Sequence, residues 1–474
     1  MWGNRRGPAS VPRWPPSCEV GADLTAAHGP IPRRKLVLFA LPEYAVYLGS
    51  IPVALYLPFV YAKDFGLELA DVGLILMLAR VSDVITDPLI GYLSDRTGGR
   101  FGRRKPWMAA GCALMTASAF MLFNPPGAVS NAYLLIGSVC LWLGWTLINI
   151  PYYAWGAELS DSYHERTRIT GWRQAFAFFG NVSVLAVPVV AGQVTGYGSL
   201  PREGLTIIGF MALIALPVMI TATLVGVRER ADMRPVRSPL IGNLRVMLRN
   251  GSFLLLFFGF LLQSLGTGWG SATFMLFAAY VIEAEAQTQA ILLGYYGFNV
   301  VSLPVWVAIA QRVGKKPTWV AGGVLFVFVT PLFLLLGGGD LGWFFVVLAL
   351  YGIAGGNFAA ISMSMKADVI EIASRRSGED IAASYIAVWS LGQKLVGALA
   401  LGLALPLLQA LGFSADGGNS PEDIRMLSYV YVLPPWLCYA LAVVVIWRYP
   451  ISATRLARIR ERFDRRDARR AAVA

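Results

Sequence analysis

Two aspartates inside an apolar stretch are the residues of this chain best placed to do chemistry. Asp83 and Asp87 lie four residues apart, with the apolar run 74–78 before them and the run 89–93 after them. On a helix this spacing puts both carboxylates on one face, about 6 Å apart. A charge at the centre of a membrane helix costs about 2.5–3.5 kcal/mol and marks ion or substrate pathways. Because two carboxylates this close repel each other, we expect them to share a proton or to bind a cation such as Na⁺.

One lysine in a later apolar stretch has the charge to balance this pair. Lys394 lies deep in the stretch 382–411, where its side chain cannot easily reach the membrane surface. If a cation displaced Lys394 from Asp83 and Asp87, cation binding would be coupled to a movement of the protein. The alternative is a purely structural ion pair that never separates.

The elements that position these residues are apolar stretches long enough to cross a bilayer. The chain has 474 residues, 56% hydrophobic and only 14% charged, whereas a soluble chain carries about 25% charge. Stretches of about 20 apolar residues can each span a membrane. We count twelve of them: 36–61, 71–93, 106–123, 132–157, 173–195, 204–227, 252–282, 288–311, 317–337, 342–366, 382–411 and 427–448.

Positive charge gathers in every second loop. Lys and Arg follow the second, fourth, sixth, eighth and tenth stretches, whereas the loops 124–131 and 283–289 contain neither. Since positive loops stay in the cytoplasm, we predict that both termini are cytoplasmic, as twelve crossings require. The net charge of +12 therefore reflects topology, and no nucleic acid partner is expected. We expect a monomer in the lipid bilayer of the plasma membrane, the inner membrane of a bacterium.

The two halves of the chain resemble each other. GRFGRRKPW at 99–107 is echoed by QRVGKKPTW at 311–319, and Lys105 matches Lys316 at an offset of 211 (316 − 105). Glu158 and Asp368 end corresponding stretches at an offset of 210 (368 − 158). Duplicated halves that enclose one site are the architecture of major facilitator transporters. We therefore predict an all-α membrane protein with twelve transmembrane helices in two pseudo-symmetric six-helix halves.

This repeat divides the chain into five predicted parts. They are a disordered cytoplasmic tail (1–34), the N-terminal half (35–227), a cytoplasmic linker (228–250), the C-terminal half (251–449) and a basic cytoplasmic tail (450–474). The repeat stops at the aspartate pair, because Gly294 stands where the C-terminal half would match Asp83. A single polar site enclosed by two similar scaffolds is expected to show this asymmetry.

Charged residues at the predicted cytoplasmic ends of the stretches form a second group. Acids and bases lie there beside the basic loops, and we predict a salt-bridge gate between the halves; solvated loop charges are the alternative. The gate residues are Asp95, Arg96, Arg104, Glu158 and Asp368.

Four segments resemble the glycoside–pentoside–hexuronide:cation symporters, the melibiose permease group of the major facilitator superfamily. They are Arg80–Trp107, where DxxxDPxxG runs into GYLSDRTGGR; Thr146–Tyr152, followed by GAELSDSYHERTRITGWR; ADVIEI at 367–372; and Trp389–Lys394. The resemblance implies cation-site roles for Asp83, Asp87, Thr146 and Lys394, and a sugar-site role for Arg173.

The chain departs from that group at three places. Asn149 replaces a sugar-binding aspartate, Tyr47 and Leu48 stand where a Lys–Asp pair is expected, and Thr86 replaces an asparagine linked to sodium use. Coupling to H⁺ is therefore at least as well supported as coupling to Na⁺.

From these observations we expect a cation-coupled symporter of a sugar, glycoside or similar small polar solute, with no cofactor beyond the coupling ion. The predicted substrate-binding residues are Arg173, Asn149, Tyr153, Trp145 and Trp389. The alternatives are a transporter of lipid-like or amphipathic cargo and a non-transporting sensor or assembly factor. An enzyme is not expected, because the two histidines and four cysteines show neither metal-ligand spacing nor a nucleophile–base arrangement.

Overall fold

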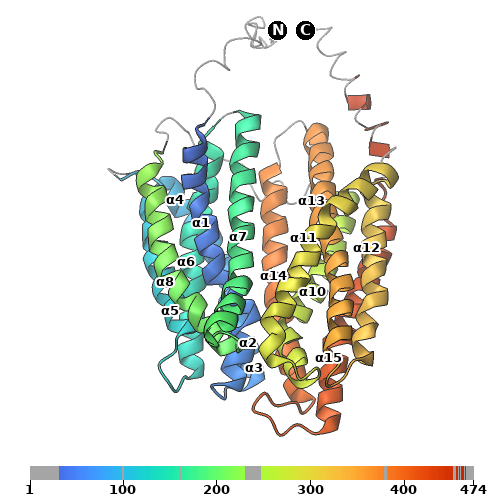
Figure 1. Cartoon of the computed structure of the whole chain (residues 1–474). Coiled ribbons are helices and arrows are strands. Elements are labelled where there is room, and N and C mark those ends of the chain that lie inside the picture. Colours follow the sequence, from blue (N-terminus) through green and yellow to red (C-terminus); the bar gives the residue numbers. More distant parts are fainter. Residues whose placement is uncertain are drawn as a thin grey trace, which may run out of the picture.

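Helices in two groups, side by side, make up the computed structural model of this chain (Figure 1). The structure describes residues 31–98, 101–160, 162–229, 247–377 and 382–451, together with single positions and short pieces between 455 and 465. No strand occurs in these residues. Most of the predicted tail 1–34, of the linker 228–250 and of the tail 450–474 lies outside the described residues.

The N-terminal half is built from the first six membrane crossings. Two of these crossings consist of two helices each, because the chain is interrupted at Tyr56 and again at Ser82. The helices are α1 (Arg33–Leu55), α2 (Leu57–Lys63), α3 (Leu69–Val81), α4 (Asp83–Arg96), α5 (Lys105–Phe123), α6 (Asn131–Glu158), α7 (Tyr163–Thr195) and α8 (Pro201–Gly226).

The C-terminal half repeats this order of six crossings. Its third crossing ends in a short 3₁₀ helix, and another short 3₁₀ helix precedes its second. The elements are α10 (Gly251–Tyr280), η1 (Glu285–Gln287), α11 (Thr288–Val313), α12 (Lys315–Val329), η2 (Thr330–Leu335), α13 (Leu341–Ser377), α14 (Ala382–Ala410) and α15 (Pro421–Trp447).

The break at Ser82 divides the second crossing directly before the aspartate pair. Within the described residues, eleven helices are long and apolar enough to cross a membrane by themselves; α3 and α4, with 13 and 14 residues, complete the twelfth crossing together. The Ser82 hydroxyl donates to the Ala79 carbonyl oxygen at 2.7 Å, a side-chain bond that competes with the helix ladder. Asp83 thereby becomes the first residue of α4, where a negative charge is favourable.

The two halves touch mainly at the end of the bundle away from the chain termini. We call the end where α1 begins and α15 ends the terminus end, and the other the opposite end (Figure 1). At the opposite end Lys63 pairs with Glu285, and the Gln409 side chain bonds both the Ala70 amide and Glu68. The hydrogen bonds and ion pairs between the halves for which both partners are described include Gln289 with the Leu200 carbonyl oxygen and Lys394 with Asp87, and they lie at the opposite end or at membrane depth. This conformation is therefore closed at the opposite end.

Candidate functional site

Lys394 lies against both aspartates at the meeting of the two halves. Its Nζ is 2.5 Å from Asp87 Oδ2 and 3.2 Å from Asp83 Oδ2. The Thr146 hydroxyl donates to Asp87 Oδ1 at 3.0 Å, so α4, α6 and α14 all contribute to the group. The structure thus brings together the four predicted cation-site residues. Because Lys394 belongs to the C-terminal half and the other three to the N-terminal half, this contact ties the halves together.

Arg80 is a second base at the aspartate pair, and the sequence reasoning did not assign it a role. Its Nη1 donates to Asp83 Oδ2 at 2.9 Å, three residues along the chain. Its guanidinium lies 3.7 Å from the centre of the Trp142 ring and 5.4 Å from that of Trp145. A basic residue at membrane depth, one helical turn before an acid, was the signal available in the sequence.

Two buried oxygens beside the pair have no hydrogen-bond partner in the described part of the chain. They are Asp83 Oδ1 and the hydroxyl oxygen of Thr86. The Asp83 side chain is only 1% exposed, whereas that of Asp87 is 23% exposed. Carboxylate and hydroxyl oxygens are suitable ligands for a hard cation, so the group has acceptor atoms beyond those that its lysine and arginine occupy.

A cavity of about 380 Å³ borders this group. Residues of α1, α3, α6 and α14 line it, and three of the predicted substrate residues, Trp145, Asn149 and Tyr153, are among them. Arg80 and Trp145 both line the cavity; Arg80 donates to Asp83, and the centre of the Trp145 ring lies 4.5 Å from Lys394 Nζ. The volume falls within the usual range of about 300–1,000 Å³ for small-molecule sites.

The other two predicted substrate residues do not line this cavity. Trp389 is 1% exposed and packs inside the C-terminal half, with its ring 4.5 Å from that of Phe260 and 5.7 Å from that of Phe257. Arg173 pairs with Glu43 of α1, with Nη2 2.7 Å from Oε1. The rotation of each helix about its axis decides which residues face the cavity, and sequence spacing alone does not give it.

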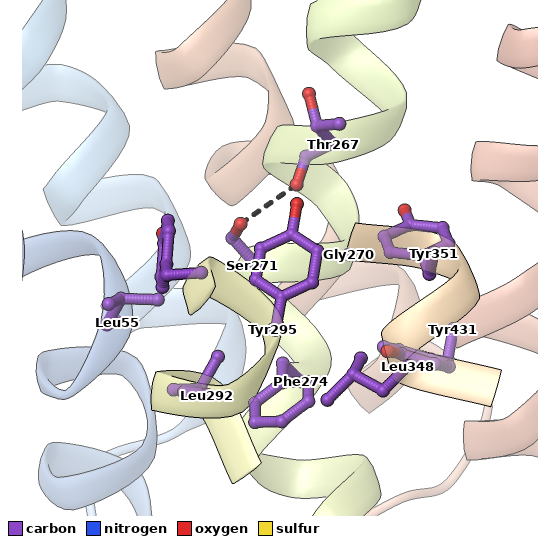
Figure 2. Close-up of a pocket in the computed structure, with 11 residues that line it drawn as sticks. Leu55, Thr267, Gly270, Ser271, Phe274, Leu292, Tyr295, Leu348, Tyr351 and Tyr431 are labelled. Carbon is purple, nitrogen blue, oxygen red and sulfur yellow. Dashed lines mark hydrogen bonds between the residues drawn. The ribbon is translucent and has the colours of Figure 1, made fainter. Parts of the chain in front are cut away.

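A smaller cavity of about 30 Å³ is lined by residues of the C-terminal half and by Leu55 of α1 (Figure 2). Tyr295, Tyr351 and Tyr431 surround it, and the Ser271 hydroxyl donates to the Thr267 backbone oxygen at 2.9 Å. This volume holds about two water molecules, which is too little for a sugar ring. In the repeat, Gly294 corresponds to Asp83, and the next residue, Tyr295, lines this cavity. The C-terminal half therefore has neutral hydroxyl groups where the N-terminal half has its acid pair.

The predicted gate residues form ion pairs within each half. Arg104 lies 2.6 Å from Asp95 and 2.9 Å from Glu158, and Lys315 lies 2.5 Å from Asp368. These pairs repeat between the halves at offsets of 211 (315 − 104) and 210 (368 − 158). Arg96 is exposed, with its guanidinium 3.9 Å from the Tyr92 ring centre. None of these pairs crosses between the halves in this conformation, so a gate between them stays a prediction.

Glu229 holds the basic loop before α5 in place, and the sequence reasoning did not assign it a role either. Its carboxylate accepts from the backbone amides of Arg103, Arg104 and Lys105 at 2.7–3.0 Å. An acid at a helix N-terminus is stabilised by the amides exposed there. The available signal was an acid next to Arg228 and Arg230, among the basic residues that follow the sixth crossing.

The family model for MFS/sugar transport proteins matches residues 38–453 of the chain. The chain belongs to this family. It is therefore a multi-pass membrane transporter of a small molecule and not an enzyme. The match covers both halves and every residue of the aspartate–lysine group.

Several named relatives align with nearly the whole chain. The inner membrane symporter YicJ of Escherichia coli is 23% identical over 88% of this chain and 91% of its own length. The glucuronide carrier protein homolog of the same organism is 25% identical over 91% of this chain and 96% of its own. The sodium-dependent lysophosphatidylcholine symporter 1 of Mus musculus is 23% identical, with coverages of 89% and 87%.

Solved structures support the fold. A bacterial homologue of the human lysosomal transporter Spinster superposes with a TM-score of 0.61 at 14% identity, over 91% of this chain and 98% of that one. The twelve-helix, two-half arrangement predicted from the sequence is thereby confirmed, whereas the side of the membrane on which the termini lie stays a prediction.

Proposed function

We propose that this protein is a cation-coupled symporter of a sugar, a glycoside or a similar small polar solute. The observation that carries this proposal is the position of Lys394 between Asp83 and Asp87. A cation that binds the aspartates must compete with a lysine from the other half of the protein. Cation binding therefore weakens a contact that holds the halves together, which links it to alternating access.

Charge balance gives the order of events in the proposed cycle. Lys394 and Arg80 together neutralise Asp83 and Asp87. A proton on one carboxylate, or Na⁺ between the two, takes over the role of Lys394, because two unscreened carboxylates at this distance repel strongly. The substrate then binds in the cavity, the halves rearrange, and both solutes leave on the other side.

Both coupling ions remain part of the proposal. Na⁺ would use side-chain oxygens of Asp83, Thr86, Asp87 and Thr146. Two of these oxygens, Asp83 Oδ1 and the Thr86 hydroxyl oxygen, have no hydrogen-bond partner among the described residues. A proton needs only one carboxylate.

The cavity lining supports a sugar-like substrate. Trp145 and Tyr153 offer ring faces, while Asn149, Gln393 and Ser50 offer neutral hydrogen-bonding groups. Sugars bind through this combination of apolar ring faces and directed hydrogen bonds. The names of the glucuronide and YicJ relatives are consistent with such a substrate and with the bacterial inner membrane.

An amphipathic cargo is the second candidate. The same cavity has apolar lining residues, among them Val46, Leu76 and Leu401, and one relative is named for lysophosphatidylcholine. This candidate requires an opening of the cavity toward the lipid, through which an acyl chain enters.

Uptake by vesicles containing the purified protein tests the proposal. A panel of neutral glycosides, hexuronides and lysolipids is offered with and without Na⁺, at two external pH values. We expect accumulation of a glycoside or uronide driven by one of the two ion gradients. Accumulation of lysolipid alone would favour the second candidate, and gradient-independent equilibration of every solute would contradict coupling.

A further inference from the structure

Glu43 and Arg173 form a buried ion pair beside the central cavity. Arg173 Nε and Nη2 both donate to Glu43 Oε1, at 2.9 and 2.7 Å. Glu43 is 3% exposed, and the Arg173 side chain is 13% exposed. These two hydrogen bonds direct the Arg173 guanidinium to a protein side chain, although the resemblance to the melibiose permease group implies that it contacts a sugar.

The same guanidinium packs against two tyrosine rings of α6. Its central carbon lies 4.1 Å from the centre of the Tyr153 ring and 4.8 Å from that of Tyr152. Tyr152 is fixed from the other side, because its hydroxyl donates to the Phe39 carbonyl oxygen at 2.6 Å. Tyr153 differs, since it is 41% exposed and lines the cavity.

Gly156 leaves the space that this arrangement needs. A Cβ atom there would lie 3.3 Å from the Phe39 ring and 3.5 Å from Arg173 Nη1. Three helices, α1, α6 and α7, therefore meet around one guanidinium with little room for it to move.

We propose that Arg173 is a positioning residue that supports the Tyr153 ring from behind, and that Glu43 determines specificity by keeping Arg173 out of the cavity. This inference rests on the proposed transport of a sugar-like solute. A cation packed against a ring face holds the ring through cation–π attraction. At this position the cavity then presents a neutral ring, which suits an uncharged sugar face, and Arg173 is not available as a charge partner for a substrate carboxylate.

A double-mutant cycle tests whether Arg173 acts through Tyr153. The measured quantity is the Kd of 4-nitrophenyl β-glucoside for the purified protein, in wild type, Arg173→Gln, Tyr153→Leu and the double variant. We expect each single change to raise Kd about tenfold, and the double change to raise it little further, because interacting residues are non-additive. If the double change raised Kd about a hundredfold, which is the product of the two single effects, Arg173 would contact the substrate directly.

Neutralising Glu43 tests the specificity claim. Glu43→Gln frees a charged guanidinium next to the cavity, so the affinity for 4-nitrophenyl β-glucuronide relative to the glucoside should rise about tenfold. Glu165→Gln is the matched control, because Glu165 also pairs with an arginine of α7 but lies outside the site. An unchanged ratio in a folded Glu43→Gln protein would overturn the claim.

The cycle needs no change at Glu43, so it still decides the positioning role if Glu43→Gln does not fold. A wild-type protein that binds neither probe would count against the proposed sugar substrate, and with it against this inference. If the wild-type protein binds the glucoside and the free-energy effects of the two substitutions simply add, this inference is overturned while the proposed sugar substrate stands.

Discussion

At the scale of single residues, Lys394 links the charge state of Asp83 and Asp87 to the contact between the two halves. Asp83 and Asp87 face one lysine from the other half and one arginine from their own helix pair. Removing one member of a buried ion group costs about 3–5 kcal/mol, because an uncompensated charge remains. Changes that preserve the balance of charge should therefore be tolerated better than single changes.

A compensating pair of substitutions tests this balance. Lys394→Gln leaves the carboxylates without their partner and should lower the thermal unfolding temperature of the protein, measured in detergent. Adding Asp87→Asn removes one negative charge and should recover most of the loss. A double variant that is less stable than Lys394→Gln would contradict the assignment of Lys394 to Asp87.

Arg80 gives a second prediction at this scale. Arg80→Lys keeps the charge toward Asp83 but loses the planar group that stacks on Trp142. We expect KM for the transported solute to rise about tenfold, roughly the effect of one cation–π contact. Arg202→Lys is the control, since Arg202 also lies over a ring, that of Phe65, but outside the cavity. Equal effects of the two changes would argue against a role of Arg80 in the site.

Close packing of α3 against α14 is the main contact between the halves at the scale of helices. Gly73 allows it, because a Cβ there would lie 2.8 Å from the Leu401 carbonyl oxygen and 2.9 Å from Leu405 Cβ. Gly402 of α14 also allows the close packing, because a Cβ there would overlap the sulfur of Met77 in α3. Small residues allow helices to approach in this way within membranes. The opposite end can therefore close only while these positions stay small.

Replacing Gly73 should open the opposite end. Gly73→Leu separates α3 from α14, so a cysteine at Ser50, which lines the cavity, should react several-fold faster with an impermeant maleimide added from that side. The background lacks the four native cysteines. Gly342→Leu is the control, because no atom lies within 4 Å of the corresponding Cβ. Equal labelling in both variants would show that Gly73 does not control closure.

The whole molecule is a duplicated scaffold around one asymmetric site. The Arg104–Glu158 pair and the Lys315–Asp368 pair occupy matching positions, whereas the acid pair occurs in the N-terminal half only. Duplication supplies two bodies that can rock against each other, and the asymmetry supplies one place where an ion and a substrate meet. This arrangement is what alternating access requires.

The sequence predicted the crossings well because apolar length is a local property. It missed the break at Ser82 and began α7 at 173 instead of Tyr163, since the first turns of α7 are polar. Asp83, Asp87 and Lys394 were predicted from charges inside apolar stretches and Thr146 from the resemblance, and the structure brings the four residues together. Arg80, the Glu43–Arg173 pair and the burial of Trp389 depend on how neighbouring helices are rotated, which hydropathy and spacing do not encode.

Uphill transport by the Asp87→Ala variant tests the central claim most directly. Vesicles containing wild-type protein should concentrate the solute identified by the uptake panel above its external level when the cation gradient points inward. The Asp87→Ala protein should lose this accumulation entirely, while still exchanging labelled for unlabelled solute across the membrane. Accumulation by Asp87→Ala to the wild-type level would contradict the assignment of Asp83 and Asp87 as the coupling site.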